Sequence, residues 1–120
     1  MSVVPAVEKV LKDFHSSKKV IGMCCISPVI AARVFGSNKG GPGVTLTLGA
    51  RGDNWPYNGS IDAAAGMGNK MEIKDVLEVC VDENNLIVTT PAYMKGDAKP
   101  HEIVDGIESM VKEVGKRVSK

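Results

Sequence analysis

Two adjacent cysteines, Cys24 and Cys25, are the residues of this sequence best suited to covalent chemistry. They end the apolar run "VIGMCC" and are followed by "ISPVIAARVF", where Ser27 and Pro28 are typical of the first residues of a helix. A cysteine between a strand and a helix lies beside free backbone N–H groups and the positive end of the helix dipole, which stabilise the thiolate. The pattern therefore indicates a nucleophile on a sharp strand-to-helix turn.

The spacing favours Cys25 over Cys24 as that nucleophile. Counted from Cys25, the second and third following residues are Ser27 and Pro28, where the helix should begin. Counted from Cys24, the second residue is the bulky Ile26, although a sharp turn favours small neighbours. We therefore expect Cys25 in the turn and Cys24 in a core. The alternative, in which both thiols only fill space, stays open because free cysteines are among the most buried residues.

Helix-like and strand-like segments alternate along the chain. Helical patterns cover residues 3–16, 27–36, 60–65 and 103–118. Strand patterns cover residues 18–24, which we expect to be fully buried, then "VTLTLG", then the two halves of "VLEVCVDENNLIVTT" around a turn at 82–85. The alternation predicts one α/β domain over residues 1–120, built as a layered sheet with helices packed on it.

The composition excludes several other classes of protein. Fifteen basic and fourteen acidic residues give a net charge of +1, and aromatic residues are few, so no nucleic-acid surface is expected. No apolar stretch reaches the roughly 20 residues of a membrane span. Two histidines and the lack of a C-x-x-C pair speak against a metal site, and we expect no cofactor. The three cysteines, in a chain without an export signal, are expected to be reduced.

Four stretches of the sequence together resemble one known family. They are "KKVIGMCCISPVIAARVF", "NWPYNGS", "VDENNLIVTTPAYM" and "IVDGIESMVKEV", and they resemble the enhancing-lycopene-biosynthesis (ElbB) family. Its animal members are the mitochondrial glutamine amidotransferase-like class I domain-containing proteins, and the family belongs to the DJ/PfpI superfamily. The resemblance runs from Val3 to Val118 and covers only the C-terminal half of the family's domains. It implies a flavodoxin-like layered sheet without its N-terminal half, and a cytoplasmic or mitochondrial location.

The same resemblance implies a site and a chemistry. Cys25 takes the position of the superfamily's elbow cysteine, and the backbone N–H of Ile26 takes that of an oxyanion-stabilising donor. The other elbow and pocket positions that it implies are Ser27, Pro28, Thr90 and Pro91. The implied substrates are small molecules with carbonyl or amide-like bonds, as in glyoxalases, deglycases and amidotransferases.

A base for this thiol is missing from the sequence pattern. Animal relatives carry a histidine at the position of Ala50, while His15 should lie at the opposite edge of the sheet and His101 lies outside any family motif. A thiol nucleophile works best beside a base. Two functions therefore stay open: an enzyme with Cys25 as nucleophile, and a non-catalytic regulatory or redox-sensing relative in which Cys25 is oxidised.

Because the resemblance covers only the C-terminal half of the family's domains, we also expect partners. Strands that normally flank the elbow strand have no counterpart here, so residues 20–24 should present unpaired backbone groups beside an apolar face. We expect a homo-oligomer, or a complex with a complementing N-terminal half.

Overall fold

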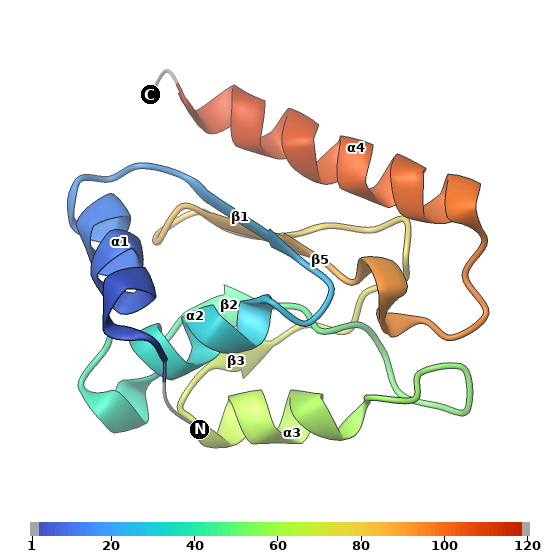
Figure 1. Ribbon diagram of the computed structural model, residues 1–120, viewed down its shortest axis with the longest axis horizontal. Helices are drawn as coiled ribbons and strands as arrows, with labels where there is room; N and C mark the ends of the chain where they lie inside the picture. Colours follow the sequence, from blue (N-terminus) through green and yellow to red (C-terminus); the bar gives the residue numbers. More distant parts are fainter. Residues whose placement is uncertain (1–2, 119–120) are drawn as a thin grey trace.

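The computed structural model describes residues 3–118 and places two small sheets among four α-helices (Figure 1). The helices are α1 (Pro5–Ser16), α2 (Pro28–Phe35), α3 (Gly59–Gly66) and α4 (Pro100–Val118), with short 3-10 helices η1 (Ser37–Lys39) and η2 (Ala92–Met94). The strands are β1 (Ile21–Cys24), β2 (Thr45–Leu46), β3 (Lys70–Met71), β4 (Cys80–Asp82) and β5 (Ile87–Thr90).

The larger sheet has the strand order β1-β5-β4. β1 runs parallel to β5, with Cys24 opposite Thr90, and β4 runs antiparallel to β5. The turn between β4 and β5 closes where the sequence predicted it, because Asp82 accepts a hydrogen bond from the backbone N–H of Asn85 at 3.0 Å. The parallel β1–β5 pair brings the end of β1 and the end of β5 to the same edge of the sheet.

The smaller sheet, β2-β3, is tied to the larger one by two side chains. Asp82 accepts a hydrogen bond from the backbone N–H of Thr45 at 2.8 Å, and Thr89 accepts one from Thr47 N–H at 3.0 Å. The strand predicted at "VTLTLG" is therefore only two residues long, and its following residues bond to side chains instead of a neighbouring strand. β3 was not predicted, because two residues carry no alternating pattern.

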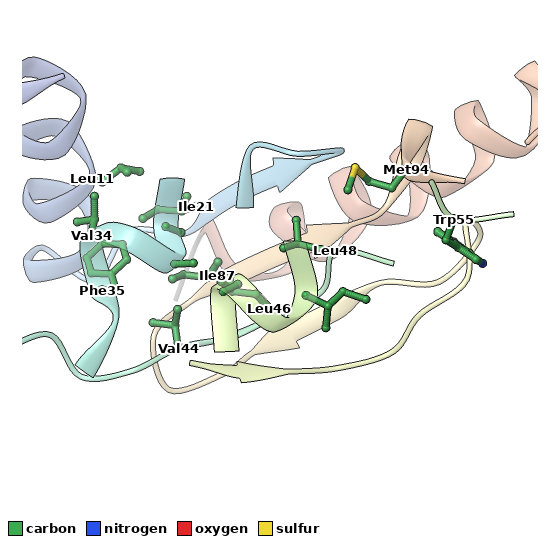
Figure 2. Packing of buried hydrophobic residues seen from close by; sticks show 14 residues of the cluster. Leu11, Ile21, Val34, Phe35, Val44, Leu46, Leu48, Trp55, Ile87 and Met94 are labelled. Atoms are coloured by element: carbon green, nitrogen blue, oxygen red, sulfur yellow. The ribbon is translucent and has the colours of Figure 1, made fainter. Parts of the chain in front are cut away.

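The three-stranded sheet separates two hydrophobic clusters. α4 covers one face, where Val76, Ala92 and Ile103 form the smaller cluster (Figure 1). The larger cluster holds Ile87 and Leu46 at its centre, with side chains from α1 and α2 at one end (Figure 2). All four residues of β5 are fully buried, so this central strand carries the packing of both faces.

One expectation about the N-terminal segments is wrong. The strand over residues 18–24 is not fully buried: it is an edge strand in which Ile21 is buried and Gly22 is exposed. The helix expected over residues 3–16 is present as α1, in which Leu11 is buried while Val10 and Phe14 are exposed. β1 is an edge strand because no further strand lies beside it within residues 3–118.

Candidate active site at the end of β1

Cys25 lies in the turn between β1 and α2 with a backbone φ of +60°. This left-handed conformation is uncommon for a residue with a Cβ atom and costs about 1–3 kcal/mol. Such strain persists only where the surrounding structure enforces it. The backbone at Cys25 therefore has the sharp strand-to-helix turn expected of a nucleophile elbow.

Hydrogen bonds from both sides hold this turn. The Ser27 hydroxyl donates to the carbonyl of Cys24 at 2.7 Å and accepts from Cys24 N–H at 3.1 Å. Cys25 N–H donates to the carbonyl of Thr90 at 3.1 Å, so the end of β5 reaches the elbow as the resemblance implied. Ser27 thus fastens the turn backwards onto β1 and makes no side-chain cap on α2, which begins at the buried Pro28.

The backbone N–H of Ile26 is the donor that the turn leaves open. Ser27 N–H is taken by the Cys24 carbonyl, and Cys25 N–H is taken by Thr90. Among residues 3–118, no acceptor bonds Ile26 N–H. An N–H group free at a helix start can bind an anion or a developing oxyanion.

Cys25 opens into an apolar pocket of about 460 Å³. The pocket is lined by Cys25, Ile26, Tyr57, Tyr93 and Met94. Tyr57 comes from the loop before α3, and Tyr93 and Met94 come from η2. Neither an ionised side chain nor an imidazole is among these lining residues. The pocket suits an uncharged ligand with an apolar part.

Two predicted pocket residues hold the scaffold instead of lining the pocket. The Thr90 hydroxyl donates to the carbonyl of Glu78 at 2.9 Å, on the approach to β4. Pro91 is fully buried and precedes Ala92, which has a φ of +47°. This bend turns the chain from β5 into η2 and so delivers Tyr93 and Met94, which sequence reasoning did not single out. The sequence did contain a signal for these two residues, because in "PAYM" they follow closely after the strand that meets the elbow.

The three thiols differ sharply in their surroundings. Burial raises the pKa of Cys80, together with a hydrogen bond to Glu72, to about 12. Burial, and then the neighbouring Cys25, raise the pKa of Cys24, which packs against the cluster beneath α4. Cys24 therefore points into a core, as the spacing predicted. Cys25 is the thiol that faces the pocket.

Both histidines lie away from the pocket lining. His15 forms a 2.8 Å hydrogen bond with the Asn85 side chain and stacks on Phe35, at the end of the sheet opposite the elbow. His101 is exposed in the first turn of α4, and Ala50 is half-buried against the larger cluster. In the described part of the chain, no three metal-ligating side chains come close enough to hold an ion. Over the same residues, none of the helices is long and apolar enough to cross a membrane.

The fold and the elbow together define an α/β domain of the amidotransferase-like kind. The solved structure of an isoprenoid biosynthesis protein with an amidotransferase-like domain, from Ehrlichia chaffeensis, superimposes with a TM-score of 0.78 at 22% identity. The superposition covers 96% of this chain and 47% of that one. The flavodoxin-like fold expected from the sequence is thereby confirmed.

Curated proteins of similar sequence define the relationship more closely. The chain is 47% identical over 111 residues to the mitochondrial ES1 protein homolog of Rattus norvegicus. It is 46% identical over 111 residues to the human mitochondrial glutamine amidotransferase-like class 1 domain-containing protein 3. Each alignment covers 90% of this chain, which spans only 39% of either relative. The chain is a homologue of these proteins, which confirms the resemblance found in the sequence. No protein-family model matches the chain.

Proposed function

We propose that this chain carries a cysteine nucleophile, Cys25, that acts on small uncharged carbonyl compounds. One observation supports this above the others: the thiol on a strained turn opens into an apolar pocket that an open backbone N–H borders. Backbone strain beside a pocket is a feature of functional sites. The chain is also homologous to a protein named for a glutamine amidotransferase-like domain, which makes chemistry on an amide or carbonyl group a reasonable hypothesis.

The first chemical step is addition of sulfur to the carbonyl carbon. The Cys25 thiolate forms the S–C bond, and the π-electron pair of the carbonyl moves to its oxygen. Ile26 N–H is suited to stabilise that oxyanion, which then takes up the proton that the thiol released. With an aldehyde the product is a hemithioacetal. With an amide, the proton released by the thiol goes to the amide nitrogen instead; the oxyanion then re-forms the C=O bond as the C–N bond breaks, which releases the amine and leaves a thioester on Cys25.

The lining of the pocket favours neutral substrates over glutamine. Glutamine brings an ammonium and a carboxylate, and a charge that leaves water needs a partner. Tyr57 and Tyr93 offer only phenol groups, and Ile26 and Met94 offer apolar surface. We infer that a neutral aldehyde or ketone binds better than an amino acid amide.

Oxidation of Cys25 is the second candidate function, and one observation favours it. The lining of the pocket holds neither an imidazole nor a carboxylate to move protons during turnover. Oxidation by a peroxide needs only the thiolate: an S–O bond forms, the O–O bond breaks, and the products are a sulfenic acid and, after protonation, water.

A matched pair of aldehydes tests the first function. Methylglyoxal is a neutral aldehyde, whereas glyoxylate is a small aldehyde that carries a carboxylate. A comparison of the two therefore measures the effect of a negative charge on binding. We expect methylglyoxal to protect Cys25 from iodoacetamide at roughly tenfold lower concentration than glyoxylate, because the apolar lining penalises the carboxylate. Reversible uptake of methylglyoxal as the hemithioacetal should be lost in Cys25→Ala and kept in Cys24→Ala.

Two other outcomes would contradict the carbonyl function or the substrate selection inferred for it. Failure of both aldehydes to protect Cys25, with rapid sulfenic acid formation by hydrogen peroxide, contradicts the carbonyl function and supports oxidation. Equal protection by both aldehydes contradicts the selection for neutral substrates.

We also propose a mitochondrial location, because the relatives from Rattus norvegicus, Homo sapiens and Danio rerio are all named mitochondrial. Immunofluorescence of the untagged protein in its own cells should coincide with a mitochondrial marker. Staining elsewhere would contradict this proposal.

A further inference from the structure

The two tyrosines of the sequence both lie at the pocket beside Cys25. Tyr57 is 62% exposed and Tyr93 is 67% exposed, although both side chains line the pocket. Over residues 3–118, neither ring contacts another aromatic ring and neither hydroxyl makes a hydrogen bond. Large aromatic side chains exposed beside a pocket are typical of ligand-binding surfaces.

The segments that carry these tyrosines are fastened to each other. Gly96 N–H, just after η2, donates to the carbonyl of Asn54 at 2.6 Å. A Cβ atom at Gly96 would lie 3.4 Å from Cδ of Pro56, so the two segments pack closely next to Tyr57. A backbone hydrogen bond therefore fixes the spacing of the two segments that form this side of the pocket.

Each segment is also anchored in the core. Trp55 and Met94 are buried in the larger cluster, at the same end of it (Figure 2). The Asn58 side chain donates to the carbonyl of Trp55 at 2.9 Å, and the Ser60 hydroxyl donates to the carbonyl of Tyr57 at 2.7 Å. The backbone that carries the tyrosines is thus ordered before a ligand binds, and a tyrosine side chain has only two χ angles to fix, so the entropic cost of binding is small.

The pocket is larger than the smallest carbonyl compounds require. Its volume is about 460 Å³. Methylglyoxal has five non-hydrogen atoms and would fill roughly a third of that volume, at about 30 Å³ for each water-sized group. Ile26, Met94 and the two tyrosine rings form the rest of the lining. A larger apolar group attached to the carbonyl carbon would displace water from this surface and bind more tightly.

We propose, on the basis of the carbonyl function of Cys25, that Tyr57 and Tyr93 select carbonyl compounds that carry an aromatic ring. The ring of the substrate packs against the two tyrosines while its carbonyl carbon meets the Cys25 thiol. Aromatic rings gain more from contact with one another than their buried area alone provides. A flat ring also makes closer contact with a tyrosine face than a puckered ring of the same carbon number.

Burial of apolar area alone predicts the opposite preference. A cyclohexyl group has more apolar surface than a phenyl group with the same number of carbons, so a pocket without aromatic walls prefers the cyclohexyl compound. Aromatic walls reverse this order. Two aldehydes that differ only in the ring therefore separate selection by the tyrosines from general hydrophobic burial.

Protection of Cys25 from iodoacetamide measures this preference. In the wild-type protein we expect phenylacetaldehyde to protect at about fivefold lower concentration than cyclohexylacetaldehyde. 2-Phenylethanol has no carbonyl group and should protect more weakly than the aldehyde, but still at a lower concentration than 2-cyclohexylethanol, because its ring alone occupies the pocket.

Substitution of the tyrosines assigns the preference to them. Tyr57→Leu and Tyr93→Leu each keep an apolar side chain but lose a ring, so each should reduce the preference to about twofold or less, and the double variant should reverse it. Tyr57→Phe and Tyr93→Phe keep the rings and should keep the preference. Phe14→Leu is the matched control, because it removes a ring that is 41% exposed on α1 and outside the lining of this pocket. Equal melting temperatures would show that the fold is intact in all variants.

The outcomes separate this inference from the function on which it rests. If the phenyl compounds are preferred but neither aldehyde protects better than its alcohol, the carbonyl function fails and the selection of aromatic rings stands. If methylglyoxal protects Cys25 but the cyclohexyl compounds protect as well as the phenyl compounds, or better, the inference is wrong and the function stands. A phenyl preference that survives the loss of both tyrosine rings also overturns the inference. Absence of protection by all of these compounds contradicts both.

Discussion

A thiol and an imidazole lie at opposite ends of β5, too far apart to form one site. At the carboxyl end, Thr90 accepts the Cys25 N–H, and the thiol faces a pocket. At the amino end, Asn85 bonds both His15 and Asp82. From Asn85 to Thr90 the strand spans roughly 16 Å, far beyond the reach of a proton transfer.

The two ends differ in how completely their polar groups are hydrogen-bonded. At the amino end, Asp82 is buried and accepts hydrogen bonds from Thr45 N–H and from both the backbone and the side chain of Asn85. At the carboxyl end, the backbone is strained and the Ile26 N–H is open. A complete polar network stabilises a fold, whereas an incomplete one can bind something else. We therefore expect changes at one end to alter stability and changes at the other to alter reactivity.

The largest expected effect concerns the rates of thiol alkylation. With a pKa of about 12, Cys80 is thiolate to roughly one part in 10⁴–10⁵ at pH 7.5, and it is also buried. Iodoacetamide in limiting amount should label Cys25 at least about 100-fold faster than Cys80, with Cys24 in between. Peptide mass spectrometry of the adducts measures this order. First labelling of Cys24 or Cys80 would show that the elbow is assigned to the wrong thiol.

The next effect is the loss of the network at the amino end. Asp82→Ala leaves the Thr45 N–H without its acceptor and frees the turn at Asn85. A buried unsatisfied donor costs about 1–3 kcal/mol, so we expect a loss of about 2–3 kcal/mol in the free energy of unfolding. Urea denaturation measures it. Exposed Asp97→Ala is the control and should change stability by less than about 0.5 kcal/mol.

The sequence predicted the elbow better than it predicted the site around it. Cys25, Ser27 and Pro28 are close in sequence, and local steric and dipole effects decide their geometry. The pocket depends on Tyr57 and Tyr93, which come from segments on either side of β3 and β4 and meet only after the chain has folded. No local pattern links residues so far apart, so the pocket lining could not be read from spacing.

The burial of the first strand was mispredicted for a related reason. Apolar periodicity in residues 3–16 and 18–24 indicates which side chains can be buried, but it does not identify their partners. In the structure, Leu11 and Ile21 meet the core, while Phe14 and Gly22 face outward. Apolar periodicity alone therefore does not decide which of these side chains are buried.

A smaller effect tests the strain at the elbow. Cys25→Gly and Cys25→Ala both remove the thiol, but only glycine adopts a φ of +60° without steric cost. We expect the glycine variant to be about 1 kcal/mol more stable than the alanine variant, despite the greater flexibility of glycine in the unfolded chain. Thermal melting of both proteins measures the difference. A more stable alanine variant would mean that the turn is not left-handed in solution.

The smallest effect asks whether the two ends of β5 are independent. His15→Ala removes the hydrogen bond to Asn85 and the contact with the Phe35 ring, whose centroid lies 4.8 Å away. The expected loss of stability is about 1 kcal/mol, the size of one hydrogen bond at a half-buried position. The rate at which iodoacetamide labels Cys25 should change less than twofold, because the imidazole is a strand length away from the thiol. A tenfold fall in that rate, with the fold intact by circular dichroism, would show that His15 reaches the elbow in solution and acts as the base that the pocket lining lacks.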